Sequence, residues 1–229
     1  MRVHYISHAP FEGLGAINQW VKDHDHVVSG TRSYAGEPMP DPSSFDLLIV
    51  MGGPQSATEY EKYDFLQDEV ELIRASIKAN KYILGTCLGG QLIGIALGAP
   101  STRSPHKEMG CFPIELTEEG KSDRIFQHFP PQFPGIHWHH DMIGIPKGAA
   151  VLAKSEGCPV QAVRFSEKVY GLQCHLEFTE KRMRTLIEKC PRDLPPSQYT
   201  QTPEQMLSCH FSEVNQYIIR FLDLLVQFA

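Results

Sequence analysis

The feature that most constrains the fold is an uncharged stretch from Tyr82 to Pro100, which holds five glycines and one cysteine, Cys87. A membrane-spanning helix would need about 20 predominantly apolar residues, but the glycines and the polar Gln91 interrupt this stretch. It divides instead into a short apolar strand at 81–86, a turn at Cys87 and a helix at 88–98. We therefore expect a strand–turn–helix unit inside a globular protein.

Three glycines of this expected helix, Gly90, Gly94 and Gly98, recur at every fourth position and so share one helical face. Each glycine costs a helix about 1 kcal/mol relative to alanine, so their repetition needs a structural reason. We expect them to let the helix lie close against a sheet.

The first half of the chain alternates strand and helix signals. Segments 2–7 and 46–52 are short and apolar, as in strands, whereas 64–79 has apolar residues at helical spacing. This alternation predicts an α/β fold with three layers, in which helices flank a mainly parallel, twisted sheet.

The second half is richer in short strands, which predict a small antiparallel addition to the sheet: 110–116, 150–155, 159–165 and 169–177. Helical patterns follow at 179–190 and about 204–227. The proline-rich segment 190–205 between them is interpreted as an ordered surface loop. One helix after this loop is too little for a second domain, so we expect residues 1–229 to form a single domain.

Composition and charge narrow the function classes. Hydrophobic residues make up 41% of the chain and charged residues 21%, which is a globular balance, and the net charge is −6. A surface for nucleic acid or an anionic membrane would need a basic patch. The six cysteines include no C-x-x-C pair, and the N-terminal apolar run is too short for a secretory signal. We expect a reduced, cytoplasmic protein that binds neither nucleic acid nor membrane.

Cys87 is placed where a strand ends and a helix begins, at the edge where open α/β sheets bind ligands. Amides and the dipole at a helix N-terminus stabilise a thiolate, and G-T-C-L-G at 85–89 has the mechanics of the G-x-S-x-G elbow of serine hydrolases. The amides of Leu88 and of Gly53, in a Gly-Gly-Pro after a neighbouring strand, would form an oxyanion hole. Each motif alone is also compatible with a buried thiol or an ordinary turn.

A nucleophilic cysteine needs a base, and His175 is the most informative of the 11 histidines. In an extended segment, Gln173, His175 and Glu177 share one face, whereas Cys174 points to the opposite face and is expected in the core. A glutamate at this spacing can orient the imidazole and stabilise its charged form. The spacing alone would favour a solvated strand face that carries two polar residues.

Together, three ordered motifs resemble the signatures of class I (triad) glutamine amidotransferases: MGGP at 51–54, GTCLGGQLI at 85–93 and GLQCHLEFT at 171–179. The chain is most similar to stand-alone proteins that resemble the amidotransferase domain of GMP synthetase, through segments 11–20, 32–41 and 137–146. The resemblance covers most of the chain. It implies a flavodoxin-like α/β fold and no cofactor.

The resemblance also implies site residues. Cys87 would attack the side-chain amide of glutamine, His175 would act as base and then acid, and Glu177 would support it. The amides of Gly53 and Leu88 would hold the oxyanion. The implied substrate-binding residues are Gly52, Gln91, Met109, Gly110, His139 and Asp141. The last four belong to two expected loops, 104–110 and 137–146, and Asp141 would meet the ammonium group of glutamine. The chain departs from the family pattern at Leu176, usually proline, and at Gly90, often a larger residue.

The implied reaction releases ammonia through a γ-glutamyl thioester that water hydrolyses to glutamate. No phosphate-binding loop of the G-x-x-x-x-G-K-[ST] type is present in the sequence, so the implied acceptor of ammonia is a separate synthetase subunit. Two alternatives stay open: a γ-glutamyl peptide or γ-glutamyl amine hydrolase with the same triad, and a non-catalytic regulatory module of the same fold.

The run H-x-H-H-D at 137–141 could supply ligands for a transition metal. We favour a substrate-pocket segment instead, because the sequence shows no second ligand cluster. We therefore expect no metal site.

Overall fold

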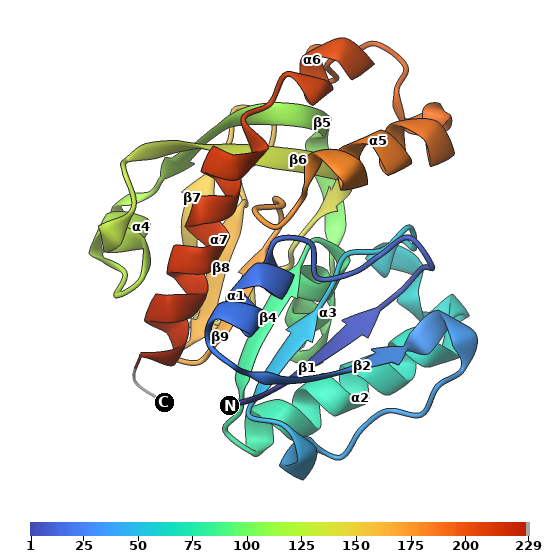
Figure 1. Ribbon diagram of the computed structural model, residues 1–229, viewed down its shortest axis with the longest axis vertical. Coiled ribbons are helices and arrows are strands. Elements are labelled where there is room, and N and C mark those ends of the chain that lie inside the picture. Colours follow the sequence, from blue (N-terminus) through green and yellow to red (C-terminus); the bar gives the residue numbers. More distant parts are fainter. Residues whose placement is uncertain (228–229) are drawn as a thin grey trace.

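A computed structural model describes residues 1–227 and has a nine-stranded sheet with helices on both faces (Figure 1). The strand order across the sheet is β2-β1-β3-β4-β9-β8-β7-β5-β6. The strands are β1 (Arg2–Ser7), β2 (Val27–Arg32), β3 (Leu47–Val50), β4 (Tyr82–Thr86), β5 (Thr102–Leu116), β6 (Gln132–Met142), β7 (Ala150–Lys154), β8 (Ala162–Ser166) and β9 (Val169–Leu172). The α-helices are α1 (Ile17–Asp23), α2 (Asp64–Lys78), α3 (Leu88–Ala96), α4 (Glu118–Ser122), α5 (Glu180–Lys189), α6 (Pro203–Leu207) and α7 (Phe211–Val226).

The sheet has a parallel and an antiparallel half. Strands β2, β1, β3, β4 and β9 run parallel to one another, whereas β9, β8, β7, β5 and β6 pair antiparallel. The predicted α/β fold is confirmed, and its antiparallel addition comprises four strands, among them the long β5 and β6.

Two helical layers enclose the parallel half. Helices α1 and α7 cover one face, and α2 and α3 cover the other (Figure 1). Every residue of β3 and β4 is buried, which explains why both strands are almost continuously apolar. Helix α2 confirms the expected 64–79 helix to within one residue.

The glycines in and just after α3 meet different neighbours. Gly90 and Gly94 meet the segment that follows β6, where an added Cβ would lie 2.7 Å from a neighbouring atom in each case. Gly89 meets the sheet itself, because a Cβ there would lie 1.9 Å from the carbonyl oxygen of Val50. The expected contact with a sheet was wrong for Gly94, whose neighbours Gly144 and Ala99 lie outside the strands. It was also wrong for Gly98, which lies past the end of α3 with φ +87° and has no neighbour within 4 Å.

Three other local expectations were wrong. The helix expected at 204–227 is two helices, α6 and α7, because α6 packs on α5 and β5 whereas α7 packs on α1 and β6. The segments 104–110 and 137–146 were expected as loops, but β5 and β6 pair with each other where Glu108–Gly110 meets His137–His139. Each strand supplies the hydrogen-bonding edge that the other needs, which their individual sequences do not reveal.

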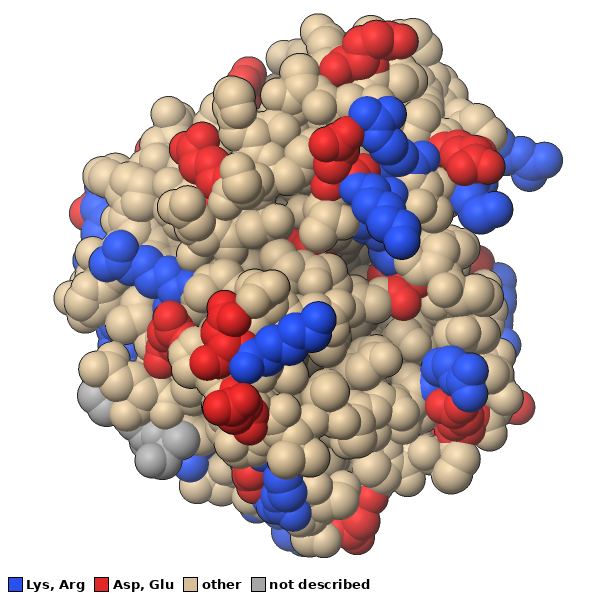
Figure 2. Space-filling view, viewed as in Figure 1, with Lys and Arg blue, Asp and Glu red and all other residues tan. Residues whose placement is uncertain are grey.

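The surface shows mixed charge. On the face shown in Figure 2, acidic and basic side chains are interspersed. Among residues 1–227, none of the helices combines the length and apolar character that crossing a bilayer requires.

Candidate active site

Cys87 occupies the predicted sharp turn between β4 and α3. Its φ of +50° and ψ of −109° lie in a region that non-glycine residues rarely adopt. The turn is held from both sides: the Cys87 amide donates to the Leu172 carbonyl at 2.6 Å, and the Gly89 amide donates to the Met51 carbonyl at 3.1 Å. Strain held by surrounding structure is characteristic of functional sites.

His175 and Glu177 form a buried hydrogen-bonded pair, with 2.7 Å between His175 Nδ1 and Glu177 Oε1. The strand expected to run through 177 ends at Leu172, because the adjacent β4 turns into α3 at Cys87. His175 instead exchanges two backbone hydrogen bonds with Ile136 of β6. This bridge keeps the His175 and Glu177 side chains together beyond the end of the strand.

His175 lies next to Cys87. A Cβ on Gly52 would lie 3.1 Å from His175 Cε1 and 3.5 Å from Cys87 Cβ, so both residues flank the same glycine. Burial would lower the pKa of His175, but the Glu177 carboxylate and the neighbouring Cys87 outweigh it and raise this pKa to about 10. His175 therefore carries a proton at neutral pH, and a thiolate at Cys87 would have an imidazolium partner.

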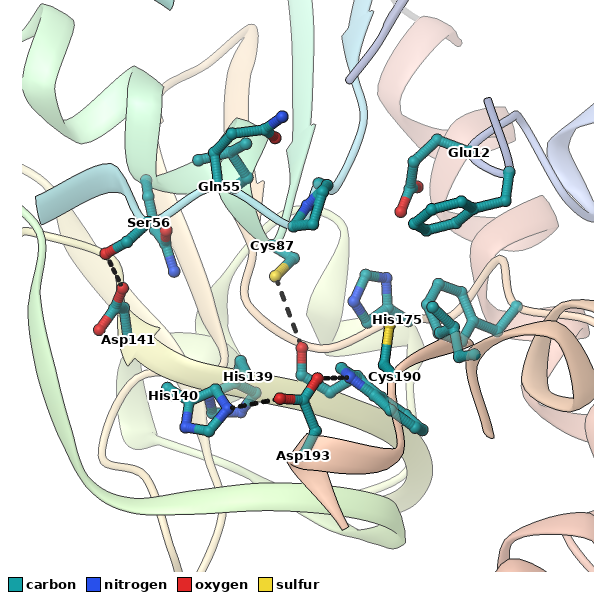
Figure 3. Close-up of a pocket in the computed structure, with 18 of the residues that line it drawn as sticks. Glu12, Gln55, Ser56, Cys87, His139, His140, Asp141, His175, Cys190 and Asp193 are labelled. Carbon is teal, nitrogen blue, oxygen red and sulfur yellow. Dashed lines mark hydrogen bonds and ion pairs between the residues drawn. The ribbon is translucent and has the colours of Figure 1, made fainter. Parts of the chain in front are cut away.

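Cys87 and His175 open into a cavity of about 360 Å³ (Figure 3). Its wall also includes Gly53, Leu88 and Gln91, which are three of the residues that the sequence predicted for the site. Leu88 is the first residue of α3, so its amide has no acceptor within the helix. A Cβ on Gly53 would lie 2.9 Å from Leu88 Cδ2, which places the two segments in contact.

Gln91 and Gln173 connect the helix to the cysteine. Gln91 Nε2 donates to Gln173 Oε1 at 3.0 Å, and Gln173 Nε2 lies 3.6 Å from Cys87 Sγ. Gln173 was predicted to share the polar face of its segment with His175, but no role in the site was predicted for it. Cys174 points into the core, and burial raises its pKa well above the ordinary value.

The structure does not bring Met109 and Gly110 to this cavity. Met109 is fully buried in the core, and its backbone pairs with Tyr199 and Gln201. Gly110 faces the Gln201 side chain, which leaves no room for a Cβ. Both residues lie on a β-strand rather than on a loop, which is why they point elsewhere.

His139 and Asp141 do line the cavity. Asp141 Oδ2 accepts a hydrogen bond from Ser56 at 2.6 Å, and Arg103 Nη1 lies 2.9 Å from Asp141 Oδ1. Asp141 lies on the cavity wall opposite Glu12, and Cys87 lies between these two residues (Figure 3).

Sequence reasoning missed several wall residues. Glu12 forms an ion pair with Arg182, and burial raises the pKa of Glu12 in spite of that partner. Asp193, in the proline-rich loop, accepts a hydrogen bond from Trp138 Nε1 at 3.0 Å and lies 3.5 Å from His140 Nε2. Glu12 lies inside a segment that resembles the family, but no local signal marks Asp193.

A second histidine–carboxylate pair supports the Gly-Gly-Pro segment. His8 Nε2 lies 2.6 Å from Glu69 Oε2, and His8 Nδ1 lies 2.9 Å from the carbonyl oxygen of Gly52. Both side chains are fully buried. Burial lowers the pKa of His8, but Glu69 and the Gly52 carbonyl outweigh it and raise this pKa. The pair therefore holds the peptide that precedes Gly53.

The H-x-H-H-D run is divided between two sides of β6. His140 turns to Asp193, whereas His137 and His139 turn to Glu108. Burial lowers the pKa of His137 to about 4. Burial would raise the pKa of Glu108, but His139 and His137 outweigh it and lower this pKa.

Comparisons with known proteins agree with this geometry. A family model described as Glutamine amidotransferase class-I matches residues 25–190. The chain is 41% identical to the glutamine amidotransferase-like protein YfeJ of Salmonella typhimurium, over 97% of this chain and 96% of that protein. It is 31% identical to the glutamine-hydrolyzing GMP synthase subunit of Sulfurisphaera tokodaii, over 74% of this chain and 94% of that one.

Solved structures are similar over the whole chain. The crystal structure of SMU.1228c is 43% identical with a TM-score of 0.93, and covers 98% of this chain and 99% of its own. The crystal structure of a glutamine amidotransferase from Thermotoga maritima is 27% identical with a TM-score of 0.88, and covers 99% of this chain and 98% of its own.

Proposed function

The chain belongs to the class I glutamine amidotransferase family, and we propose that it hydrolyses the side-chain amide of glutamine with Cys87 as nucleophile. The observation that supports this most is the convergence of a strained cysteine and a buried His175–Glu177 pair on one cavity. A non-catalytic module would have no need to keep the cysteine in a strained conformation beside a charged histidine.

The proposed first half-reaction forms a thioester. Cys87 Sγ adds to the amide carbon of glutamine, and the carbonyl oxygen takes the negative charge, held by the amides of Leu88 and Gly53. Each such donor is worth about 3 kcal/mol in the transition state. His175 gives its proton to the amide nitrogen, the C–N bond breaks and ammonia leaves.

The second half-reaction releases glutamate. Neutral His175 takes a proton from water while the water oxygen attacks the thioester carbon, and the C–S bond breaks to restore the thiolate. Glu177 accepts the hydrogen bond from His175 Nδ1 throughout, which holds the ring and stabilises its charged form. Proton transfer by a positioned group contributes typically 10²–10⁴-fold to the rate.

We assign the amino-acid end of glutamine to Asp141 and Arg103. A carboxylate and a guanidinium 2.9 Å apart suit the α-ammonium and α-carboxylate groups of the substrate. Replacing Asp141 with asparagine is expected to raise KM about tenfold or more with a smaller change in kcat, since this contact is present before and during the reaction. An unchanged KM would show that glutamine binds elsewhere in the cavity.

The similarity to the GMP synthase subunit of Sulfurisphaera tokodaii supports a proposal for the fate of the ammonia. We propose that the acceptor is a separate synthetase subunit in the cytoplasm, because the polypeptide shows no phosphate-binding loop of its own. Purification of the chain from its native cells, with identification of any co-purifying ATP-using protein that raises its glutaminase rate, tests this. If no such protein exists, free ammonia is the product.

A second candidate is hydrolysis of γ-glutamyl peptides or amines. Apolar side chains, Phe11, Phe178 and Leu186, line the cavity beside the catalytic pair, and a departing ammonia would need no such wall. The two functions separate in one assay, with ammonia release measured from glutamine and amine release from γ-glutamyl peptides. Turnover of the peptides without turnover of glutamine would replace the first proposal with the second.

The nucleophile is tested by covalent labelling with a glutamine-like electrophile. The cavity holds a second cysteine, Cys190, whose pKa is raised by burial and which is therefore a matched control. We expect Cys87→Ala to abolish the label and Cys190→Ala to retain it. The reverse pattern would mean that Cys190 is the reactive thiol.

A further inference from the structure

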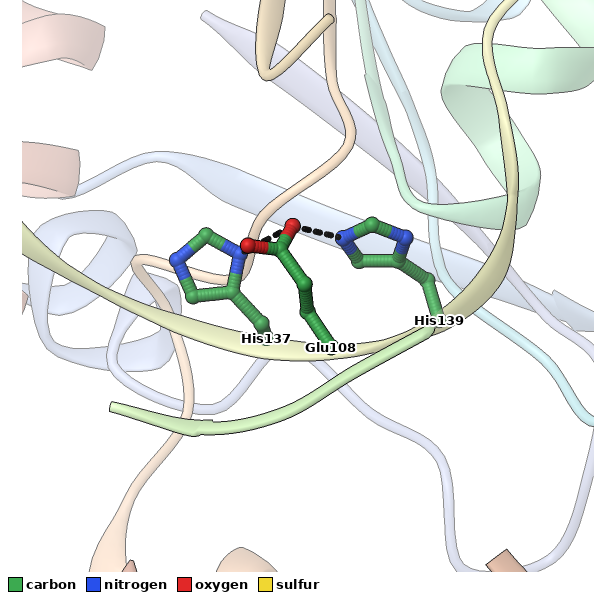
Figure 4. A group of neighbouring side chains, drawn as sticks. All are labelled: Glu108, His137 and His139. Atoms are coloured by element: carbon green, nitrogen blue, oxygen red, sulfur yellow. Dashed lines mark ion pairs between the residues drawn. The ribbon is translucent and has the colours of Figure 1, made fainter. Parts of the chain in front are cut away.

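A cluster of three buried side chains outside the proposed catalytic triad has the composition of a metal site. Glu108 of β5 lies directly opposite His139 of β6 in the strand register, and His137 lies two residues along the same face (Figure 4). One ligand atom from each residue can be chosen so that all three atoms lie within 4.8 Å of one another. None of the three side chains is more than 3% exposed.

The separations match what a bound ion requires. His139 Nε2 lies 3.2 Å from Glu108 Oε2, and His137 Nδ1 lies 3.5 Å from the same oxygen. Ligands at the 2.0–2.2 Å distances of a tetrahedral zinc ion are about 3.3 Å apart. The distances from Glu108 Oε2 to the two histidine nitrogens are therefore close to the ligand–ligand distance of a tetrahedral zinc site.

His137 supplies the second observation. Among residues 1–227, neither ring nitrogen of this fully buried side chain makes a hydrogen bond of normal geometry. A buried polar atom without a hydrogen bond costs about 1–3 kcal/mol, and His137 Nδ1 lies 3.5 Å from Glu108 Oε2. A cation between these two atoms would satisfy both of them.

The surroundings would orient the ligands. Gln161 Nε2 donates to Glu108 Oε2 at 2.7 Å, and Ser155 Oγ lies 2.8 Å from Oε1. Hydrogen bonds of this kind hold metal-binding carboxylates in place. Glu108 also lines a second cavity of about 460 Å³ together with Glu115, Glu156 and Lys154, and this cavity is the path by which a cation would reach the Glu108 carboxylate.

We propose that Glu108, His137 and His139 form a binding site for one divalent transition metal ion, with Zn²⁺ as the ion that this donor set fits. Imidazole nitrogens and carboxylate oxygens are common zinc ligands, and this site would supply two of the first and one of the second. Water from the second cavity would take the fourth coordination position. Binding at His139 Nε2 leaves the ring proton on Nδ1. Because His139 lines the proposed catalytic cavity, the ion would hold part of that wall from behind.

The test is a zinc titration of the full chain, stripped with a chelator and carrying Cys87→Ser so that the proposed nucleophile cannot bind the ion. We expect one zinc per chain, and a loss of affinity of about 100-fold or more on adding His137→Gln. His140→Gln is the matched control, since this neighbour on β6 turns to Asp193 and should leave affinity unchanged. Equal zinc affinity with and without His137→Gln would overturn the proposal.

A crystal of the zinc-loaded Cys87→Ser protein gives a readout that does not depend on how the variants fold. Anomalous scattering at the zinc edge should show a peak between Glu108, His137 and His139. A peak at another place, or none at this cluster, would overturn the assignment.

Discussion

Replacement of Glu177 with glutamine isolates the charge of the proposed triad. The glutamine oxygen can still accept the hydrogen bond from His175 Nδ1, so the ring should keep its position while the negative charge is lost. The pKa of His175 is about 10 against an ordinary 6.5. That difference corresponds to an upper limit of roughly 5 kcal/mol favouring the imidazolium, and Glu177 is its largest source.

Without that charge, the pKa of His175 is expected to fall from about 10, because burial lowers it while Cys87 still raises it. At pH 8 a larger fraction of the variant would then lack the imidazolium that is proposed to protonate the leaving group, and kcat should fall by up to about 10²–10⁴-fold. A coupled ammonia assay measures the rate, and NMR titration of the imidazole measures the pKa. An unchanged His175 titration midpoint in the variant would refute this account of the site.

Stability gives a second readout. Because folding raises the pKa of His175, protonation stabilises the wild type fully below about pH 6.5 and this contribution is lost as pH rises towards about 10. The gap in free energy of unfolding between wild type and Glu177→Gln should therefore narrow over that interval. Glu12→Gln is the matched control, since Glu12 is another buried carboxylate of the cavity but makes no hydrogen bond to His175. Its effect on the His175 midpoint should be smaller.

Two further predictions concern the frame of the site. Gly89→Ala should destabilise the fold by about 3 kcal/mol or more in urea unfolding, because its Cβ would lie 1.9 Å from the Val50 carbonyl oxygen. Gly13→Ala is the control and should be nearly neutral, because an added Cβ there would have no atom within 4 Å. Equal effects of the two substitutions would contradict the packing argument. His8→Ala should lower kcat about tenfold or more with little change in KM, because it frees the peptide between Gly52 and Gly53, whose amide is a proposed oxyanion donor. His8→Asn should restore part of the rate, since its side-chain amide can still donate to the Gly52 carbonyl. A change in KM alone would indicate a different role for His8.

The local chemistry of the candidate site was readable from the sequence. The apolar strand and glycine-rich helix around Cys87 predicted a sharp turn, and the structure has it at φ +50°. The alternation of an extended chain placed His175 and Glu177 on one side of their segment, and the two side chains lie 2.7 Å apart although the strand itself ends at Leu172. These features depend on bonds and periodicities within a few residues, so a linear sequence contains them.

The expectations that failed concern contacts between distant segments. Met109 and Gly110 were assigned to substrate because their segment resembles a family loop, but strand pairing of β5 turned them into the core and onto Gln201. Asp193 reached the cavity wall through a proline-rich loop that carries no site signal. Side-chain direction at such positions is set by register, and a shift of one residue would reverse it.

By itself, the sequence determined that a thiol would stand at a strand–helix turn and that a histidine and a glutamate would share one side of a later segment. Only the tertiary structure decided which groups surround them. The His8–Glu69 pair beneath Gly52, and Glu108 between two histidines, join residues far apart in the chain. Their meeting depends on strand order and register, which arise from the summed packing of the whole core rather than from any local pattern.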